Sequence, residues 1–253
     1  MRGRDAGAAR CGRDWPDSGS VPPLPLRVSR DLPDLAPLID HALLDPHHGA
    51  EAVGERIAEA RHFGFAGVCL ASRWLPTARP LLPAGERVKL ISVVGFPFGA
   101  VPAAIKRAEA EAAAAAGAEE LDVVPDFGAL ADGDSNAVHD DLAAITELGL
   151  PGKVIVEVGR LEDAALQLLV EASLDAGVRW LKSGSGFGPP VTPGQIRRLA
   201  ELARGRAGVK AAGGINSLEQ AYALVEAGAT RLGTSRGLAL MEALRSPRAS
   251  SQS

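Results

Sequence analysis

Hydrophobic and polar positions alternate along the middle of this 253-residue chain in two kinds of segment. Short β-prone apolar runs are each followed by a longer stretch with the spacing of an amphipathic helix. Eight such runs predict strands at residues 35–41, 64–71, 88–96, 120–127, 153–159, 178–184, 208–214 and 230–236. The clearest helical stretches cover 50–64, 103–117, 162–177 and 217–229, and most of them close with a Gly that suits a helix C-cap.

Strands that alternate with helices in this way predict a parallel sheet, and eight repeats can close it into a barrel. A doubly wound open sheet is the main rival, but the turn DHALLDPHHGA after the first run lacks a G-x-G-x-x-G pattern. A solenoid is disfavoured because the helices share no repeated consensus. We therefore predict an α/β protein, a single (β/α)₈ TIM barrel over residues 31–245, with a flexible N-terminal extension at 1–30 and a flexible tail at 246–253.

Composition and charge limit the classes of protein to which this chain could belong. The apolar share of 46%, the charged share of 23% and the net charge of −4 are typical of a globular protein and give no sign of a nucleic-acid partner. No run of 18 apolar residues predicts a membrane span, and the N-terminus lacks the apolar core of a secretory signal, so we expect a cytoplasmic protein. Cys11 and Cys69 stand in unlike contexts, which argues against a disulfide, and Cys69 reads as a small buried apolar residue.

Lysine is scarce in this chain, with five Lys against 22 Arg. Lys182 comes late in the sixth predicted strand and Lys210 lies in the seventh, near the barrel end that carries active sites. Two ammonium groups about 5 Å apart, at an effective dielectric of about 20, repel by about 3 kcal/mol. This repulsion favours loss of a proton from one of them, which a carbonyl-attacking amine requires. The alternative is that each lysine pairs with a carboxylate and has a structural role only.

Acidic side chains on the predicted strands are the next candidates. Asp122 lies among apolar neighbours and is costly to bury unless it is paired, so it could pair with Lys210 and pass protons through a water, or act only as an ion-pair strut. Asp40 and His41, at the end of the first predicted strand, are weaker candidates, and His41 could equally cap the following turn. Asp126 is expected at the loop or rim.

Glycine-rich segments predict a phosphate site, because clustered backbone N–H groups must approach an anion closely. In TIM barrels the loops after the seventh and eighth strands often bind phosphate. The candidates in these loops and in the segment after Lys182 are Ser185, Gly186, Gly213, Gly214, Gly233, Ser235 and Arg236.

These residues resemble the deoxyribose-phosphate aldolase family over about residues 36–240. The matching segments, in family order, are IDHALL, GFAGVCL, VKLISVVGFPFGA, GAEELDVVPDFGAL, WLKSGSGFG, GVKAAGGI and EAGATRLGTS. The resemblance implies reversible retro-aldol cleavage of 2-deoxy-D-ribose 5-phosphate to D-glyceraldehyde 3-phosphate and acetaldehyde, with no metal or other cofactor. It also implies a homodimer.

The resemblance also assigns roles to individual residues. It implies that Lys182 is the Schiff-base nucleophile, Lys210 the second lysine that perturbs it, and Asp122 the proton-relay acid. Asp40 would be a supporting residue linked to Lys210. The phosphate would be held by Gly213, Gly214, Gly233 and Ser235.

Several positions depart from the family pattern, and we expect them to affect substrate preference more than reaction type. They are Ala42 in DHALL, Asp126, Gly159 and Arg160 in EVGRL, Gly184 in KSGSG, and Arg236. Arg236 could strengthen phosphate binding or fill the pocket. The alternatives that stay open are a Schiff-base aldolase for another aldehyde or phosphosugar, and a phosphosugar-binding barrel without turnover.

Overall fold

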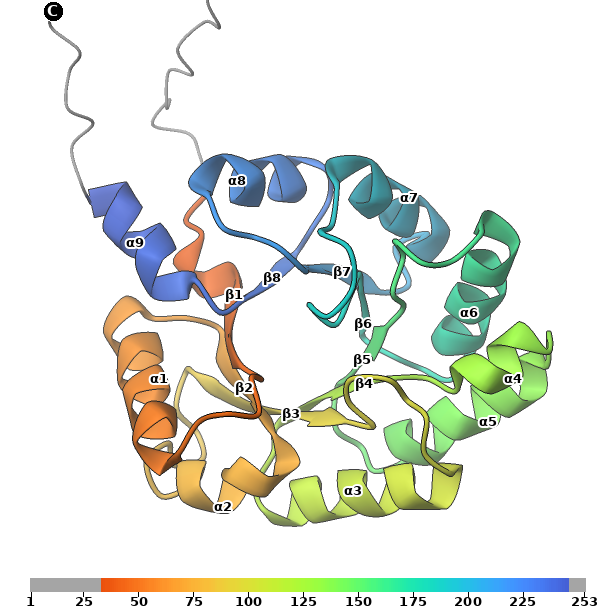
Figure 1. Ribbon diagram of the computed structural model, residues 1–253, viewed down its shortest axis with the longest axis horizontal. Coiled ribbons are helices and arrows are strands. Elements are labelled where there is room, and N and C mark those ends of the chain that lie inside the picture. Colours follow the sequence, from red (N-terminus) through yellow and green to blue (C-terminus); the bar gives the residue numbers. More distant parts are fainter. Residues whose placement is uncertain (1–32, 246–253) are drawn as a thin grey trace, which may run out of the picture. The chain divides into compact units, whose positions relative to one another are not determined.

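The computed structural model describes residues 33–245, so the predicted terminal extensions at 1–30 and 246–253 lie outside the described residues. Eight parallel strands close into a barrel in the order of the sequence, β1 to β8, with β8 pairing back to β1 (Figure 1). The strands are β1 (Ile39–Leu43), β2 (Gly67–Ala71), β3 (Lys89–Val94), β4 (Glu120–Val123), β5 (Gly152–Ile155), β6 (Trp180–Lys182), β7 (Gly208–Ala212) and β8 (Arg231–Thr234). The predicted (β/α)₈ TIM barrel is confirmed.

Helices surround the barrel on its outside (Figure 1). They are α1 (Ala50–Phe63), α2 (Leu75–Ala78), α3 (Ala103–Ala115), α4 (Phe127–Ala131), α5 (Ser135–Thr146), α6 (Asp163–Asp175), α7 (Pro193–Ala203), α8 (Leu218–Glu226) and α9 (Gly237–Arg245). Within residues 33–245, no helix has both the length and the apolar character needed to cross a bilayer. The first strand starts later than predicted, because Ala36–Leu38, which contains a proline, forms a 3₁₀ turn before it.

Alternation along the strands divides the buried side chains between two compartments. Leu121 and Val123 of β4 face outward into the large apolar core between strands and helices. Inside the barrel, Cys69, Ile91 and Val93 of β2 and β3 form a small apolar sector. Much of the remaining interior is charged instead of being filled with branched apolar residues, and that departure marks the functional site.

Candidate active site

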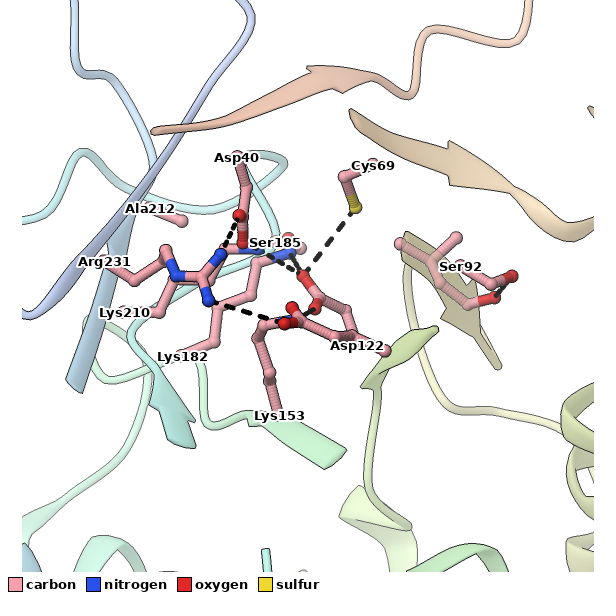
Figure 2. Close-up of polar contacts among 12 residues, drawn as sticks. Asp40, Cys69, Ser92, Asp122, Lys153, Lys182, Ser185, Lys210, Ala212 and Arg231 are labelled. Carbon is pink, nitrogen blue, oxygen red and sulfur yellow. Dashed lines mark hydrogen bonds and ion pairs between the residues drawn. The ribbon is translucent and has the colours of Figure 1, made fainter. Parts of the chain in front are cut away.

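A network of buried charges occupies the barrel interior from β4 round to β1 (Figure 2). Asp122 on β4 lies at its centre with no exposed surface. Its Oδ2 atom accepts hydrogen bonds from Lys182 Nζ at 2.9 Å and from Lys210 Nζ at 2.7 Å, and its Oδ1 atom lies 3.0 Å from Lys153 Nζ. The predicted pairing of Asp122 with Lys210 is confirmed. The two lysines are register partners on β6 and β7, which is why one carboxylate contacts both.

Lys210 has a second carboxylate partner that Lys182 lacks. Its Nζ atom lies 2.6 Å from Asp40 Oδ2, and the other oxygen of Asp40 accepts from Arg231 at 2.7 Å. Burial alone would lower the pKa of Lys210, but the carboxylates of Asp122 and Asp40 outweigh burial and raise it. Lys210 is therefore an ammonium at neutral pH. The only ion pair of Lys182 in the described part of the chain is with Asp122, which it shares with the other two lysines.

Both buried aspartates are ionised. Burial by itself would raise the pKa of Asp122, yet the positive charges of Lys153, Lys182 and Lys210 hold it well below its usual value. For Asp40, burial is likewise opposed by Lys210, Lys153 and Arg231, and the net result is a lowered pKa. These carboxylates can therefore accept hydrogen bonds from the amines around them.

Three further members of the network were missed by the sequence analysis. Lys153 on β5 lies 2.5 Å from Glu120 Oε2, and Arg231 on β8 lies 3.4 Å from Glu120 Oε1, at the start of β4. Lys153 could have been suspected, because it is one of only five lysines and falls in a predicted strand. Arg231 and Glu120 gave no such signal, because 111 residues separate them and only barrel closure brings them together.

A cavity of about 500 Å³ opens above this network at the C-terminal ends of the strands. Lys182, Lys210 and Cys69 line its inner end. All seven residues predicted for substrate or phosphate binding also line it, namely Ser185, Gly186, Gly213, Gly214, Gly233, Ser235 and Arg236. The cavity therefore joins two amines to a glycine-rich rim, a combination that suits an anionic carbonyl compound.

Gly233 has a second reason to be glycine. A Cβ atom there would lie 2.9 Å from Lys210 Cε and 3.0 Å from Ala212 Cβ, so the missing side chain makes room for Lys210. At the neighbouring strand ends, Ser183 donates to the carbonyl of Ala212 at 2.9 Å and accepts from its N–H at the same distance. These contacts fix the end of β6, which carries Lys182, against β7.

Cys69 is buried, as expected, but it borders the site. Its Sγ atom lies 3.7 Å from Asp122 Oδ2, and burial together with the Asp122 carboxylate raises the pKa of the thiol to about 12. The neutral thiol is therefore a weak hydrogen-bond donor on the apolar side of the site.

Two of the candidates predicted near strand ends, His41 and Asp126, lie outside the charge network. His41 neither enters the site nor caps the following turn, because strand alternation turns its ring outward, where Nε2 lies 2.6 Å from Glu59 and 3.0 Å from Arg56. Burial and Arg56 lower the pKa of His41 to about 4. Asp126 caps the N-terminus of α4 by accepting from the N–H groups of Gly128 and Ala129. It lies in the loop after β4, in agreement with the prediction.

Four of the departures from the family pattern lie in the cavity wall or in the segments beside it. Ala42 lines the cavity itself, and Gly184 lies next to the Ala212 carbonyl. Arg160 donates from Nη2 to the carbonyl of Phe187 at 3.2 Å, and Gly159 packs against Pro189. Arg160 also lines a second, more apolar cavity of about 500 Å³, which shares Ser185 and Phe187 with the first.

No metal-binding cluster of three or more His, Cys, Asp and Glu side chains occurs between Pro33 and Arg245. Taken together, the closed barrel, the buried amines at the C-terminal strand ends and the glycine-rich cavity define a (β/α)₈-barrel enzyme.

Comparison with known proteins agrees with this class. No family model matches the chain. The deoxyribose-phosphate aldolase of Thermosynechococcus vestitus is 46% identical over 216 residues, which cover 85% of this chain and 99% of that protein. Among solved structures, the aldolase QR15 superposes with a TM-score of 0.79 at 33% identity, covering 83% of this chain and 96% of that one. The tetrameric deoxyribose phosphate aldolase of Aeropyrum pernix gives 0.76 at 36% identity, covering 84% and 91%.

The chain belongs to the deoxyribose-phosphate aldolase family, and it is accordingly an aldehyde-lyase.

Proposed function

We propose that this protein cleaves 2-deoxy-D-ribose 5-phosphate reversibly to D-glyceraldehyde 3-phosphate and acetaldehyde through a Schiff base on Lys182. The observation that carries the proposal is the charge balance beneath the cavity. Four cations, Lys153, Lys182, Lys210 and Arg231, contact three carboxylates, Asp40, Glu120 and Asp122, so the network holds one excess positive charge. Loss of one proton from a lysine removes that excess.

Of the three lysines in the network, Lys182 is the one that contacts the fewest carboxylates. Lys210 contacts two carboxylates and Lys153 contacts two, whereas Lys182 contacts only the shared Asp122. Lys182 also lines the cavity, where a carbonyl compound can reach its Nζ atom. A neutral amine at this position is the nucleophile that imine formation needs.

The reaction then follows from the chemistry of imines. Lys182 Nζ attacks C1 of the open-chain sugar, water leaves, and the protonated imine accepts the electron pair of the C2–C3 bond as the C3 hydroxyl gives up its proton. Glyceraldehyde 3-phosphate departs, the enamine is protonated at C2, and water releases acetaldehyde. Asp122, 2.9 Å from Lys182 Nζ, is the acid–base group that we assign to these transfers, with a water between it and the sugar. Lys210, as an ammonium, favours proton donation to the carbinolamine hydroxyl, which leaves as water when the imine forms.

The phosphate would lie at the opposite end of the cavity. Gly213, Gly214 and Gly233 line the cavity without side chains, and Ser235 and Arg236 immediately precede the N-terminus of α9. A helix N-terminus and a guanidinium both favour an anion. A cytoplasmic location and a homodimer stay predictions.

Trapping the intermediate tests this proposal. The protein is incubated with deoxyribose 5-phosphate and borohydride, and the reduced adduct is located by peptide mapping and mass spectrometry. We expect the adduct on Lys182 and its loss in Lys182→Arg, which keeps the positive charge. An adduct on Lys210 would reverse the assignment of the two lysines. Binding of the phosphosugar without any adduct would favour the non-catalytic alternative.

A further inference from the structure

The loop that follows Lys182 forms a wall of both cavities. Ser185 and Phe187 line the lysine-bearing cavity and the more apolar one, and Gly186 between them lines the first. Three glycines, at positions 184, 186 and 188, allow the backbone of this loop many conformations. A loop that forms the wall of a binding cavity needs a single conformation. Some contact outside the loop must therefore define its conformation.

Those contacts come from the neighbouring segment after β5. The Val158 N–H donates to the carbonyl of Ser183 at 2.9 Å. The carboxylate of Glu157 accepts a hydrogen bond from the N–H of Ser185, and Arg160 donates to the carbonyl of Phe187. The loop is thus held at every second residue, and two of the three contacts are made by charged side chains.

The backbone of Glu157 has a conformation that residues other than glycine rarely adopt. Its φ of 47° lies in the left-handed region, which favours glycine, yet its side chain is buried with a residue exposure of 8%. Gly188 leaves space for it, because a Cβ atom there would lie 2.3 Å from Glu157 Oε2. A buried carboxylate kept in a strained conformation beside an active site indicates a functional constraint.

We propose that Glu157, together with Arg160, is a positioning residue that fixes loop 183–188 so that Ser185 and Gly186 face the phosphate end of the substrate cavity. The inference rests on the proposed function and adds to it a residue that need not touch the substrate. It also gives Arg160, which departs from the family pattern, a specific task. Loosening the loop should weaken binding of the phosphate and leave the chemistry at Lys182 largely intact.

The test compares two substrates that differ only in the phosphate, deoxyribose 5-phosphate and 2-deoxyribose. In Glu157→Ala we expect the KM for the phosphorylated sugar to rise about tenfold or more, as loss of a charged hydrogen bond implies, while kcat changes far less. The kcat/KM for 2-deoxyribose should stay near that of the parent protein. Glu157→Gln keeps an acceptor oxygen and should recover most of the affinity.

Two more variants keep the test decisive. Arg160→Ala removes an exposed side chain, its bond to Phe187 and its 4.0 Å ion pair with Glu157, so it should fold and raise the KM in the same direction by a smaller factor. Glu162→Ala removes an exposed carboxylate from the same segment and should change neither substrate. Equal losses on both sugars in Glu157→Ala and Arg160→Ala would overturn the inference, because they would indicate a general structural defect. If the parent protein cleaved neither sugar, the proposed function would fail instead.

Discussion

Replacing Asp122 by Asn tests the charge network most directly. The change keeps the shape of the side chain but leaves four cations facing two carboxylates, so the excess positive charge in the barrel interior rises from one to two. Removing one partner of a buried ion pair costs about 3–5 kcal/mol, a large share of the roughly 5–15 kcal/mol by which a folded protein is stable. We expect a loss of this size in urea unfolding at pH 7, together with a fall in kcat of about 10²- to 10⁴-fold if Asp122 moves protons.

Glu120→Gln is the matched control. Glu120 is also buried and also contacts two cations, but it lies at the start of β4, and its partners are Lys153 and Arg231 instead of the cavity-lining Lys182 and Lys210. This variant should lose a comparable free energy of unfolding, while its activity under conditions where it is folded should fall by less than about tenfold. Equal losses of activity in the two variants would refute an acid–base role for Asp122. A loss of stability below about 1 kcal/mol in Asp122→Asn would refute the reasoning about buried charge.

Three other predictions follow from the same geometry. Gly233→Ala should displace Lys210, because the new Cβ would lie 2.9 Å from its Cε. Activity should then fall by more than about tenfold while the far-ultraviolet circular dichroism spectrum is retained, and full activity would show that Lys210 can move freely. The pKa of His41 is lowered to about 4 from 6.5, so between these pH values the unfolded chain binds a proton that the folded protein does not. The free energy of unfolding should therefore fall by about 3 kcal/mol from pH 7 to pH 4, and an equal fall in His41→Gln would contradict this. Cys69, buried and with its pKa raised to about 12, should resist iodoacetamide at pH 8 until the protein is unfolded in urea, as followed on its own peptide; rapid labelling of the native protein would disprove its burial.

Local pattern was enough to predict the fold and the centre of the site. The strand and helix periods predicted eight β/α repeats, and each predicted strand overlaps an observed one. Lys182 and Lys210 could be placed together because adjacent parallel strands in a barrel have nearly the same height, and the glycines of the last loops were predicted to line the same cavity. Both inferences depend only on residue type and on position along a repeat, which the sequence contains.

The charge compensation was decided by the tertiary structure. Glu120 and Arg231 are 111 residues apart, and Asp40 and Arg231 are 191 apart, so their contacts exist only because β8 closes onto β1 across the barrel. The tertiary structure also decides the hydrogen bond from the Ser185 N–H to the Glu157 carboxylate. This bond needs a left-handed backbone at Glu157, which no residue type in the sequence indicates. The sequence alone determined which strands form and which faces they bury, because alternation is a local property. Which buried charges neutralise one another depends on distances across the closed barrel, and those were determined by the fold.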